Sequence, residues 1–497
     1  MFKFKYLIRD DVQRSFWIGL NSKRKSKAII FFKQNQRQLF RLLVKLFLRQ
    51  TKTLSATFAE KQNWMSDLKE KDQKYIWHPY THIKSTAPSI PIINGEKAIL
   101  FDEDGNKYID GISSWWVNIH GHGNKYIAKK IYEQAKKLEQ VIFTAFTHEP
   151  AVELAEKLLS VLPGNFAKIF YTDDGSTAIE VAIKMSIQYW RNKGNNQRNK
   201  IVAFRNSYHG DTFGAMSVSE RDVYTMAFRD KLFDVIFIET PDGTNFEAIH
   251  ATIENNKDEI LCFIYEPLLQ GAGGMKMYGA VNLNSLLQYL QKQEIICIAD
   301  EVLTGFYRTG KFFAGDYIDT KADIICLSKA LTGGTMPLGV TACTQKIYNE
   351  FVSNDKTKTL FHGHSFTANP LACTAAVASF DLIEKKGFLE SVENIINHHQ
   401  KFAKKLYSFE QKNYIKDVRQ TGTVIAFEIC TDGDDNYLNE VSNPFTPFCL
   451  KHGIYLRSMG NTIYVMPPYC TTSKQLKKIY SVIIHFVEKY IEQQKAD

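Results

Sequence analysis

The two residues of this chain best suited to chemistry are a carboxylate and a lysine, each placed just after an apolar run. Residues 295–299 read as a buried strand that ends in Asp300. The next such run, residues 323–327, is followed after one residue by Lys329. A lysine at the end of a buried strand is costly unless it is paired or used covalently. Asp300 and Lys329 are therefore the first candidates for catalysis.

Pyridoxal phosphate is a cofactor that needs both of these side chains. Its aldehyde requires a lysine, and its pyridine nitrogen requires an acid that keeps the ring protonated as an electron sink. Asp300 and Lys329 lie at strand ends with one crossover between them, a spacing compatible with opposite sides of one ring. A single strand-end Asp is often a helix cap, and a single lysine is often solvated, so the argument rests on the pair. No metal ligand set is expected.

Residues 171–178 run from a predicted strand into a helix and offer a site for the phosphate. Gly175 lets the backbone approach an anion, while Ser176 and the first helical N–H groups provide donors. An ordinary capped helix has a similar pattern. The prediction of phosphate binding therefore depends on the presence of the acid and the lysine.

Residues 208–211 (Tyr-His-Gly-Asp) follow another predicted strand end. Tyr208 could lie against the flat cofactor ring, although a tyrosine packed in the core is the plain alternative. We do not predict a catalytic role for His209, because a lysine released from the cofactor can itself move the proton.

Positioning these residues requires a sheet whose strand ends meet along one edge. Short β-branched or aromatic runs alternate with helical patterns, and the predicted strands are residues 168–172, 200–205, 235–239, 261–266, 295–300 and 324–328. This alternation indicates an α/β fold with a mainly parallel sheet covered on both faces, whose ligands bind beyond the carboxyl ends of the strands. From about Asn369 the chain reads as helices with a few strands, suited to a smaller domain.

Length, charge and cysteine usage limit the class of protein. A chain of 497 residues exceeds one ordinary core, so two packed domains are expected. Residues 1–64 hold 15 lysines and arginines against 3 acids, and the rest of the chain is nearly neutral, which argues against a nucleic-acid partner. The eight cysteines include no Cys-x-x-Cys pair and no secretory pattern precedes them, which favours a cytoplasmic setting. No apolar run approaches the roughly 18 residues of a membrane span.

The basic segment of residues 1–64 has several interpretations. A membrane-surface arm, a nucleic-acid arm and an organellar transit peptide would all share its shortage of acids. We favour the interpretation that Met65 is the true start and that residues 1–64 are not part of the fold. A non-catalytic binding protein with a basic arm is a further alternative, which only this segment supports.

Residues 300–310 and 327–334 together resemble, at full length, the cofactor signature of the class III (subgroup II) aminotransferases. The resemblance covers roughly residues 70 to 490. It implies the pyridoxal-phosphate-dependent transferase fold of type I, with a smaller α+β domain formed by the N- and C-terminal parts. On this basis we expect residues 65–120 and 376–497 to form the small domain and residues 121–375 the large cofactor-binding domain.

Four further segments resemble one branch of that family, the enzymes that make 7,8-diaminononanoate in biotin formation. They are residues 77–81, residues 110–116 with 120–122, residues 270–275 and residues 466–469. The resemblance implies S-adenosylmethionine as amino donor and 8-amino-7-oxononanoate as acceptor, in a ping-pong reaction through the pyridoxal and pyridoxamine forms of the cofactor. Lysine as donor, another ω-amino acid transaminase and an aminomutase of the same fold remain open alternatives.

The resemblance also implies residue roles. Lys329 would be catalytic and bind cofactor and substrate, Tyr208 would contact both, and Asp300, Gly175 and Ser176 would bind the cofactor. Tyr80, Trp115, Gly363 and Arg457 would bind substrate, with Arg457 on a carboxylate, for which a bidentate guanidinium is suited.

One cofactor segment departs from the family pattern. Gly363-His364-Ser365 stands where the enzyme of the biotin pathway has Gly-Pro-Thr, and Ser365 can still donate a hydroxyl to the phosphate. In the family this loop comes from the second subunit. The resemblance therefore implies that His364 and Ser365 bind the cofactor of a partner chain in a homodimer.

Overall fold

The computed structural model describes residues 68–84, 86–431 and 437–494, so the prediction for residues 1–64 lies outside the described part. The chain divides into two units, residues 1–91 and residues 92–497. In the first unit, α2 (Leu68–Tyr75) is followed by turns in which the His78 ring lies 2.8 Å from the carboxylate of Asp72. Tyr80 belongs to this unit, has a φ of 51° and is 42% exposed.

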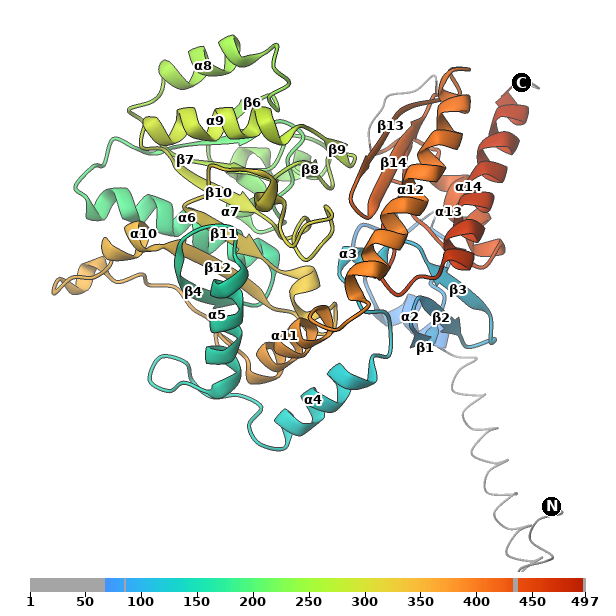
Figure 1. The fold of residues 1–497 in the computed structure, drawn as a ribbon, viewed down its shortest axis with the longest axis horizontal. Helices are drawn as coiled ribbons and strands as arrows, with labels where there is room; N and C mark the ends of the chain where they lie inside the picture. Colours follow the sequence, from blue (N-terminus) through green and yellow to red (C-terminus); the bar gives the residue numbers. More distant parts are fainter. Residues whose placement is uncertain (1–67, 85, 432–436, 495–497) are drawn as a thin grey trace, which may run out of the picture. The chain divides into compact units, whose positions relative to one another are not determined.

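The second unit is built around a seven-stranded sheet (Figure 1). Its strands, in spatial order, are β4 (Phe166–Thr172), β12 (Gly339–Thr344), β11 (Ile324–Leu327), β10 (Ile296–Asp300), β7 (Ile260–Tyr265), β5 (Lys200–Phe204) and β6 (Val235–Ile238). The five strands from β11 to β6 run parallel, and only β12 is antiparallel to its neighbours β11 and β4. The predicted α/β fold with a mainly parallel sheet is confirmed.

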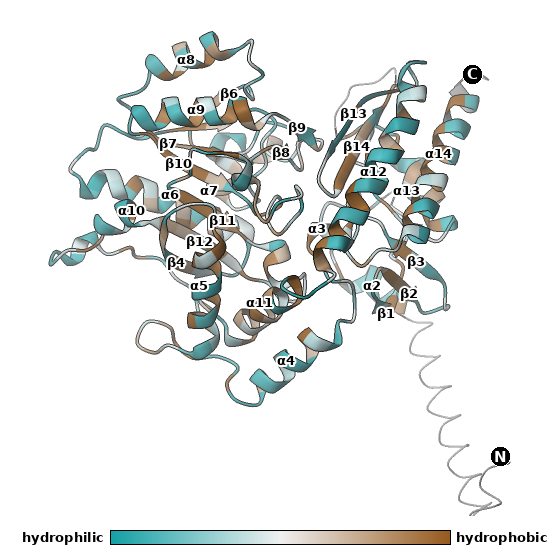
Figure 2. Cartoon of the chain, in the orientation of Figure 1, coloured by the Kyte–Doolittle hydropathy of each residue, from teal (hydrophilic) through white to brown (hydrophobic). Residues whose placement is uncertain are grey.

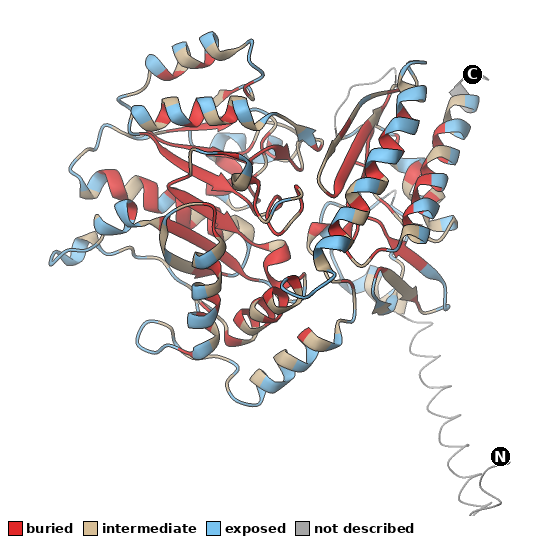
Figure 3. Cartoon of the chain, viewed as in Figure 1, coloured by how far each residue is buried: buried red, intermediate tan, exposed pale blue. Residues whose placement is uncertain are grey.

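Alternate residues of each central strand enter different cores, as a sheet covered on both faces requires. Ile296 and Ile298 of β10 pack with residues of α6 (Gly175–Asn192), whereas Cys297 and Ala299 pack in the cluster that contains the leucines of α9 (Ala280–Lys292). Every residue of β7 and β10 is buried (Figure 3). Because both faces are covered, the strands are almost continuously apolar (Figure 2).

The remaining helices of this part lie around the sheet. They are α5 (Glu149–Val161), which packs on β4, the short α7 (Phe213–Ser217) beside α6, α8 (Phe246–Glu254), α10 (Gln345–Asn349), and α11 (Pro370–Ile383), which packs on α4 (Lys125–Ala135) and on α5. A two-stranded ribbon is formed by β8 (Leu269–Gln270) and β9 (Lys276–Met277).

Segments from the two ends of the unit share a second sheet. Its strands are β1 (Ile92–Glu96), β2 (Ile99–Asp102), β3 (Lys107–Asp110) and β15 (Ile454–Tyr455), and β15 pairs in parallel with β3. A third sheet holds β13 (Ile415–Thr421), β14 (Val424–Ile429) and β16 (Thr462–Val465), and the C-terminal helices are α12 (Phe388–Glu410), α13 (Ser442–Lys451) and α14 (Ser473–Gln494). These elements form the smaller α+β part, made of N- and C-terminal segments, that the family resemblance implies. Its predicted borders at residues 120 and 375 stay predictions.

All six predicted strands of the large sheet are present, each within two residues of its predicted ends. The strand β12 was not predicted, because it starts with Gly339 and carries only two β-branched residues before its last position. Within residues 68–84, 86–431 and 437–494, no helix has the length and apolar character needed to span a membrane.

Candidate active site

Asp300 and Lys329 come from neighbouring parallel strands at the same edge of the sheet. Asp300 is the last residue of β10 and pairs in register with Cys326 of β11, so Lys329 lies three residues beyond that pair. Lys329 adopts a φ of 46°, which is unusual for a residue with a side chain. Ser328, the residue before Lys329, is held in place because its hydroxyl donates to the Leu338 carbonyl at 2.8 Å. A disfavoured backbone held in this way is typical of functional sites.

The Asp300 carboxylate is buried and held from two sides. His209 Nδ1 lies 2.6 Å from Asp300 Oδ2, and the backbone N–H of Val302 donates to Oδ1 at 3.0 Å. Because a carboxylate accepts only, the imidazole donates, and the bond is charge-assisted. His209 is 3% exposed. His209 has no predicted catalytic role in the sequence, and its partner Asp300 lies 91 positions away along the chain.

Lys329 lies in an environment that favours the neutral amine. Burial lowers the pKa of Lys329, while the charges of Asp300 and Glu266 act in the opposite direction. Its Nζ atom lies 5.4 Å from the ring centroid of Trp116. An amine with a lowered pKa is available as a nucleophile and as a proton acceptor at lower pH than an exposed lysine.

Glu266 is a buried acid of this site that the sequence patterns do not single out, although it ends a predicted strand. Its Oε1 accepts the backbone N–H of Tyr208 at 3.0 Å, and its Oε2 accepts that of Gly271 at 2.8 Å. Burial is the main cause that raises the pKa of Glu266 to about 7, and the charge of Asp300 adds to it. Glu266 thus fixes the main chain beside the predicted ring-contacting tyrosine.

The adjacent Glu301 serves a different purpose. Its carboxylate accepts hydrogen bonds from Ala314 N at 2.8 Å, Gly315 N at 2.7 Å and the Thr304 hydroxyl at 2.9 Å. Burial raises its pKa to about 7. We infer that Glu301 stabilises the loop after β10 by these hydrogen bonds.

The predicted phosphate site lies at the start of α6, where Asp174 and Thr177 form a reciprocal capping box. The backbone N–H of Asp211 donates to Ser176 Oγ at 3.2 Å. A Cβ added to Gly210 would lie 2.1 Å from that same oxygen, and one added to Gly175 would lie 2.8 Å from Cγ1 of Val302. Both positions need glycine because the main chain passes too close for a side chain.

Two connections place this helix start next to the acid. Residues 209–211 contact Asp300 through His209 and Ser176 through Asp211. Val302 donates its backbone N–H to Asp300, and its side chain occupies the space where a Cβ on Gly175 would lie. The N–H groups at the start of a long helix favour an anion there. An acid, a lysine with a lowered pKa and an anion site therefore surround one region, which fits the needs of pyridoxal phosphate.

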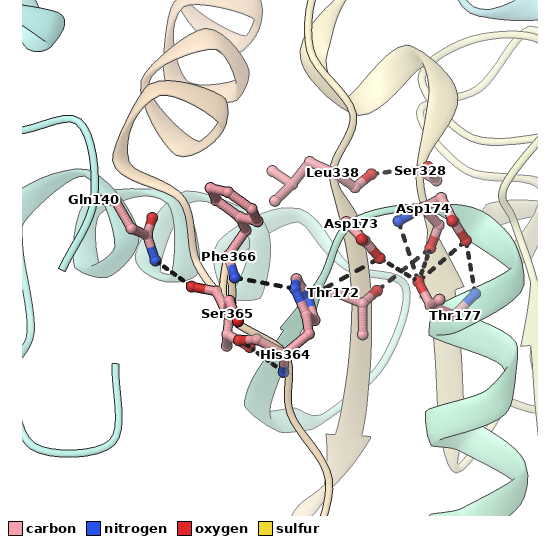
Figure 4. Close-up of polar contacts among 11 residues, drawn as sticks. Gln140, Thr172, Asp173, Asp174, Thr177, Ser328, Leu338, His364, Ser365 and Phe366 are labelled. Atoms are coloured by element: carbon pink, nitrogen blue, oxygen red, sulfur yellow. Dashed lines mark hydrogen bonds and ion pairs between the residues drawn. The ribbon is translucent and has the colours of Figure 1, made fainter. Parts of the chain in front are cut away.

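The loop that departs from the family pattern lies near the helix start of its own chain (Figure 4). His364 Nε2 is 4.0 Å from Asp173 Oδ1, and Gln140 donates to the Ser365 carbonyl at 2.8 Å. Gly363 and Ser365 are exposed. Their predicted contacts with the cofactor of a partner chain stay predictions.

The predicted substrate residue Trp115 lies in a loop whose single short turn, α3 (Ser113–Trp116), has unusual backbone angles. Ser113, Ser114 and Trp116 have φ values of 54°, 60° and 66°. The buried Asp110 carboxylate holds the loop, accepting the backbone N–H of Ser114 at 2.7 Å and lying 2.9 Å from His122 Nε2.

Arg457, the other predicted substrate residue of this unit, lies against aromatic rings. Its guanidinium carbon is 5.5 Å from the Trp115 ring centroid and 5.8 Å from that of Tyr437, whose hydroxyl accepts a hydrogen bond from Nη2. The structure thus brings Trp115 and Arg457 together. Tyr80 belongs to the other unit, and its role in the site stays a prediction.

Comparison with known proteins agrees with this geometry. Residues 80–487 match the family Aminotransferase class-III. The chain is 40% identical over 427 residues to the adenosylmethionine-8-amino-7-oxononanoate aminotransferase of Synechococcus elongatus, covering 84% of this chain and 99% of that protein. It is 36% identical to the enzyme of that name from Staphylococcus aureus, covering 85% and 98%.

A solved structure gives the same result. The crystal structure of the adenosylmethionine-8-amino-7-oxononanoate aminotransferase from Methanocaldococcus jannaschii superimposes with a TM-score of 0.81 at 34% identity, covering 85% of this chain and 98% of that one. The match over most of the chain, together with the lysine and acid at adjacent strand ends, leads to one conclusion. The chain belongs to the class III aminotransferases.

Proposed function

We propose that this chain transfers an amino group to 8-amino-7-oxononanoate, with S-adenosylmethionine as donor and pyridoxal phosphate as bound cofactor. The observation that carries the proposal is Lys329 beside the Asp300–His209 pair at the carboxyl ends of β10 and β11. The names of the relatives from Synechococcus elongatus, Staphylococcus aureus and Methanocaldococcus jannaschii support the choice of substrates.

The residues of this chain would divide the work as follows. When bound, pyridoxal phosphate supplies the electron sink that allows a C–H bond next to the amino group to break. Lys329 takes and returns the proton at its Nζ atom, and its lowered pKa keeps more of the amine neutral. Asp300, held by His209, would accept a hydrogen bond from the ring nitrogen and keep that nitrogen protonated.

Binding is assigned to the surrounding residues. Gly175 and Ser176, at the start of α6, would hold the phosphate, and Tyr208 would lie against the ring. Arg457 would pair with the substrate carboxylate beside Trp115. Tyr80 and Gly363 would complete substrate binding.

We also propose a cytoplasmic homodimer in which Gly363, His364 and Ser365 reach the active site of the partner chain. The main support is the family, together with the exposed loop that carries these residues. Sedimentation equilibrium of the cofactor-loaded protein tests the dimer. A monomer at micromolar concentration would overturn this part without affecting the reaction.

The decisive experiment isolates the donor half of the reaction. The purified protein, loaded with pyridoxal phosphate, is mixed with S-adenosylmethionine alone, and the absorbance of the bound cofactor is followed. Conversion to the pyridoxamine form supports the proposed donor. A response to lysine or to an ω-amino acid instead would retain the aminotransferase and overturn the donor assignment.

A further inference from the structure

Tyr437 is a residue that neither the motifs nor the family resemblance assigns. It lies just before α13 in a polar segment without a recognisable pattern, and it is half-buried. Its hydroxyl accepts a hydrogen bond from Nη2 of Arg457, and its ring centroid is 5.8 Å from the guanidinium carbon. The Trp115 ring is 5.5 Å from the same carbon. Two aromatic rings and one hydroxyl therefore fix the guanidinium.

These contacts leave the charge of Arg457 without a matching anion among the described residues. A guanidinium has five N–H groups, and the Tyr437 hydroxyl takes only one of the two on Nη2 as an acceptor. Aromatic faces attract the cation but do not replace a carboxylate. The remaining N–H groups keep the fork geometry that pairs with a carboxylate of a ligand.

Tyr437 also ends a row of three tyrosine side chains that begins at Tyr208. Its ring centroid is 4.8 Å from that of Tyr224, which is 6.0 Å from that of Tyr208. The lysine and the arginine are connected through the neighbouring tryptophans, since Trp116 lies against Lys329 and Trp115 against Arg457. Aromatic surface thus connects the reacting amine with the cation, as an apolar chain ending in a carboxylate would require.

We infer that Tyr437 is a positioning residue that holds Arg457 in place for the carboxylate at the far end of an apolar keto acid. This inference rests on the proposed function and adds a determinant of its substrate preference. A hydrogen bond to a charged group fixes the direction of the guanidinium, and the ring limits its rotation. Removing the hydroxyl alone should weaken recognition of the carboxylate and leave the chemical step intact.

The test compares 8-amino-7-oxononanoate with its methyl ester in wild type and Tyr437→Phe. We expect Tyr437→Phe to lower kcat/KM for the acid about tenfold, mainly through KM, and to leave kcat/KM for the ester unchanged. The matched control is Tyr407→Phe on α12, whose ring is exposed and which should change neither value. Phenylalanine keeps the ring, so packing around it should be preserved. A purely structural defect would instead lower kcat/KM equally for the acid and for the ester.

A double-mutant cycle separates Tyr437 from other effects. In an Arg457→Ala background, Tyr437→Phe should have no further effect on the preference for acid over ester. The inference is overturned if Tyr437→Phe keeps the wild-type ratio of acid to ester, or if it changes that ratio equally without Arg457. If the wild-type protein aminates neither compound, the proposed function has failed on its own. In that case, calorimetry measures the affinities of the cofactor-loaded wild type and Tyr437→Phe for nonanoate and for methyl nonanoate. The ratio of the two affinities then decides the role of Tyr437.

Discussion

The two sides of the candidate active site are built in different ways. On the cofactor side, Asp300 ends a strand, Lys329 follows the next strand closely, and Gly175 begins a long helix. On the recognition side, Trp115 lies in the segment of residues 110–122, where three non-glycine residues have positive φ. Regular backbone hydrogen bonds position the first set, whereas side-chain bonds between distant segments position the second.

The support of the tryptophan loop illustrates this difference. Arg308, which is fully buried, donates to the Ser113 hydroxyl at 2.9 Å across 195 positions of sequence, and Ser113 in turn donates to the Met466 carbonyl. Asp110 holds the other end of the loop. One substitution can break such a network of side-chain hydrogen bonds. A strand end, in contrast, is held by the backbone hydrogen bonds of the whole sheet. We therefore expect losses of chemistry on the cofactor side and losses of affinity on the recognition side.

Replacing Lys329 should have the largest effect. Lys329→Ala removes the amine that moves the proton, so kcat for amination of 8-amino-7-oxononanoate should fall on the order of 10⁴-fold. Steady-state assays measure this loss, and equilibrium dialysis with pyridoxal phosphate checks that the site still binds the cofactor. Lys292→Ala, at the exposed end of α9, is the matched control. Activity within tenfold of wild type would remove Lys329 from the mechanism.

Replacing Asp300 should have the next largest effect. Asp300→Ala removes the acceptor for the ring nitrogen and leaves His209 buried without its partner, so kcat should fall on the order of 10³-fold. The variant Glu301→Gln, one residue along, tests whether the effect is local. Because Glu301 holds a loop through hydrogen bonds, Glu301→Gln should mainly lower the Tm and should change kcat little. Equal losses of kcat in both variants would contradict the separate roles.

The cofactor side could be predicted from sequence because its signals are local. An apolar run with a polar residue at its end gives both the strand and the candidate, and this logic found six strands, Asp300, Lys329 and the glycine at the start of α6. The strand β12 is not predicted, because it begins with glycine and has few β-branched residues.

The contacts that join distant segments could not be predicted in this way. His209 reaches Asp300 only because the segment after β5 folds over the end of β10, two strands away in the sheet. Tyr437 reaches Arg457 because the chain before α13 returns to the segment after β15. Neither the residue type nor the spacing carries this information, so these partners require the three-dimensional arrangement.

Loosening the tryptophan loop tests the recognition side. Asp110→Ala removes the acceptor for the backbone N–H of Ser114 and for His122, so unfolding stability should fall by about 3 kcal/mol. We expect KM for the keto acid to rise about tenfold while kcat changes less, since Lys329 and Asp300 stay in place. Chemical denaturation and steady-state kinetics measure the two effects, with the exposed Asp319→Ala as control. A fall in kcat without a change in KM would contradict the division between the two sides.

The smallest expected effect concerns the buried acid Glu266, which holds the main chain at Tyr208. The folded protein raises the pKa of Glu266 from its ordinary value of 4.5 to about 7, so folding favours the protonated form. The stability that Glu266 contributes is therefore fully present below pH 4.5 and is lost as the pH rises through about 7. Glu266→Gln cannot titrate, so its stability relative to wild type should increase by about 2 kcal/mol between pH 5 and pH 8.

Denaturation curves at several pH values measure this difference. The exposed Glu390→Gln, in the first turn of α12, should show no such trend. Any constant cost of losing a backbone acceptor at Glu266 cancels, because only the change with pH is used. Parallel stability curves for wild type and Glu266→Gln would mean that Glu266 keeps its ordinary pKa. The carboxylate would then be ionised at neutral pH beside Asp300, and its charge would help to hold Lys329 as the ammonium rather than the free amine.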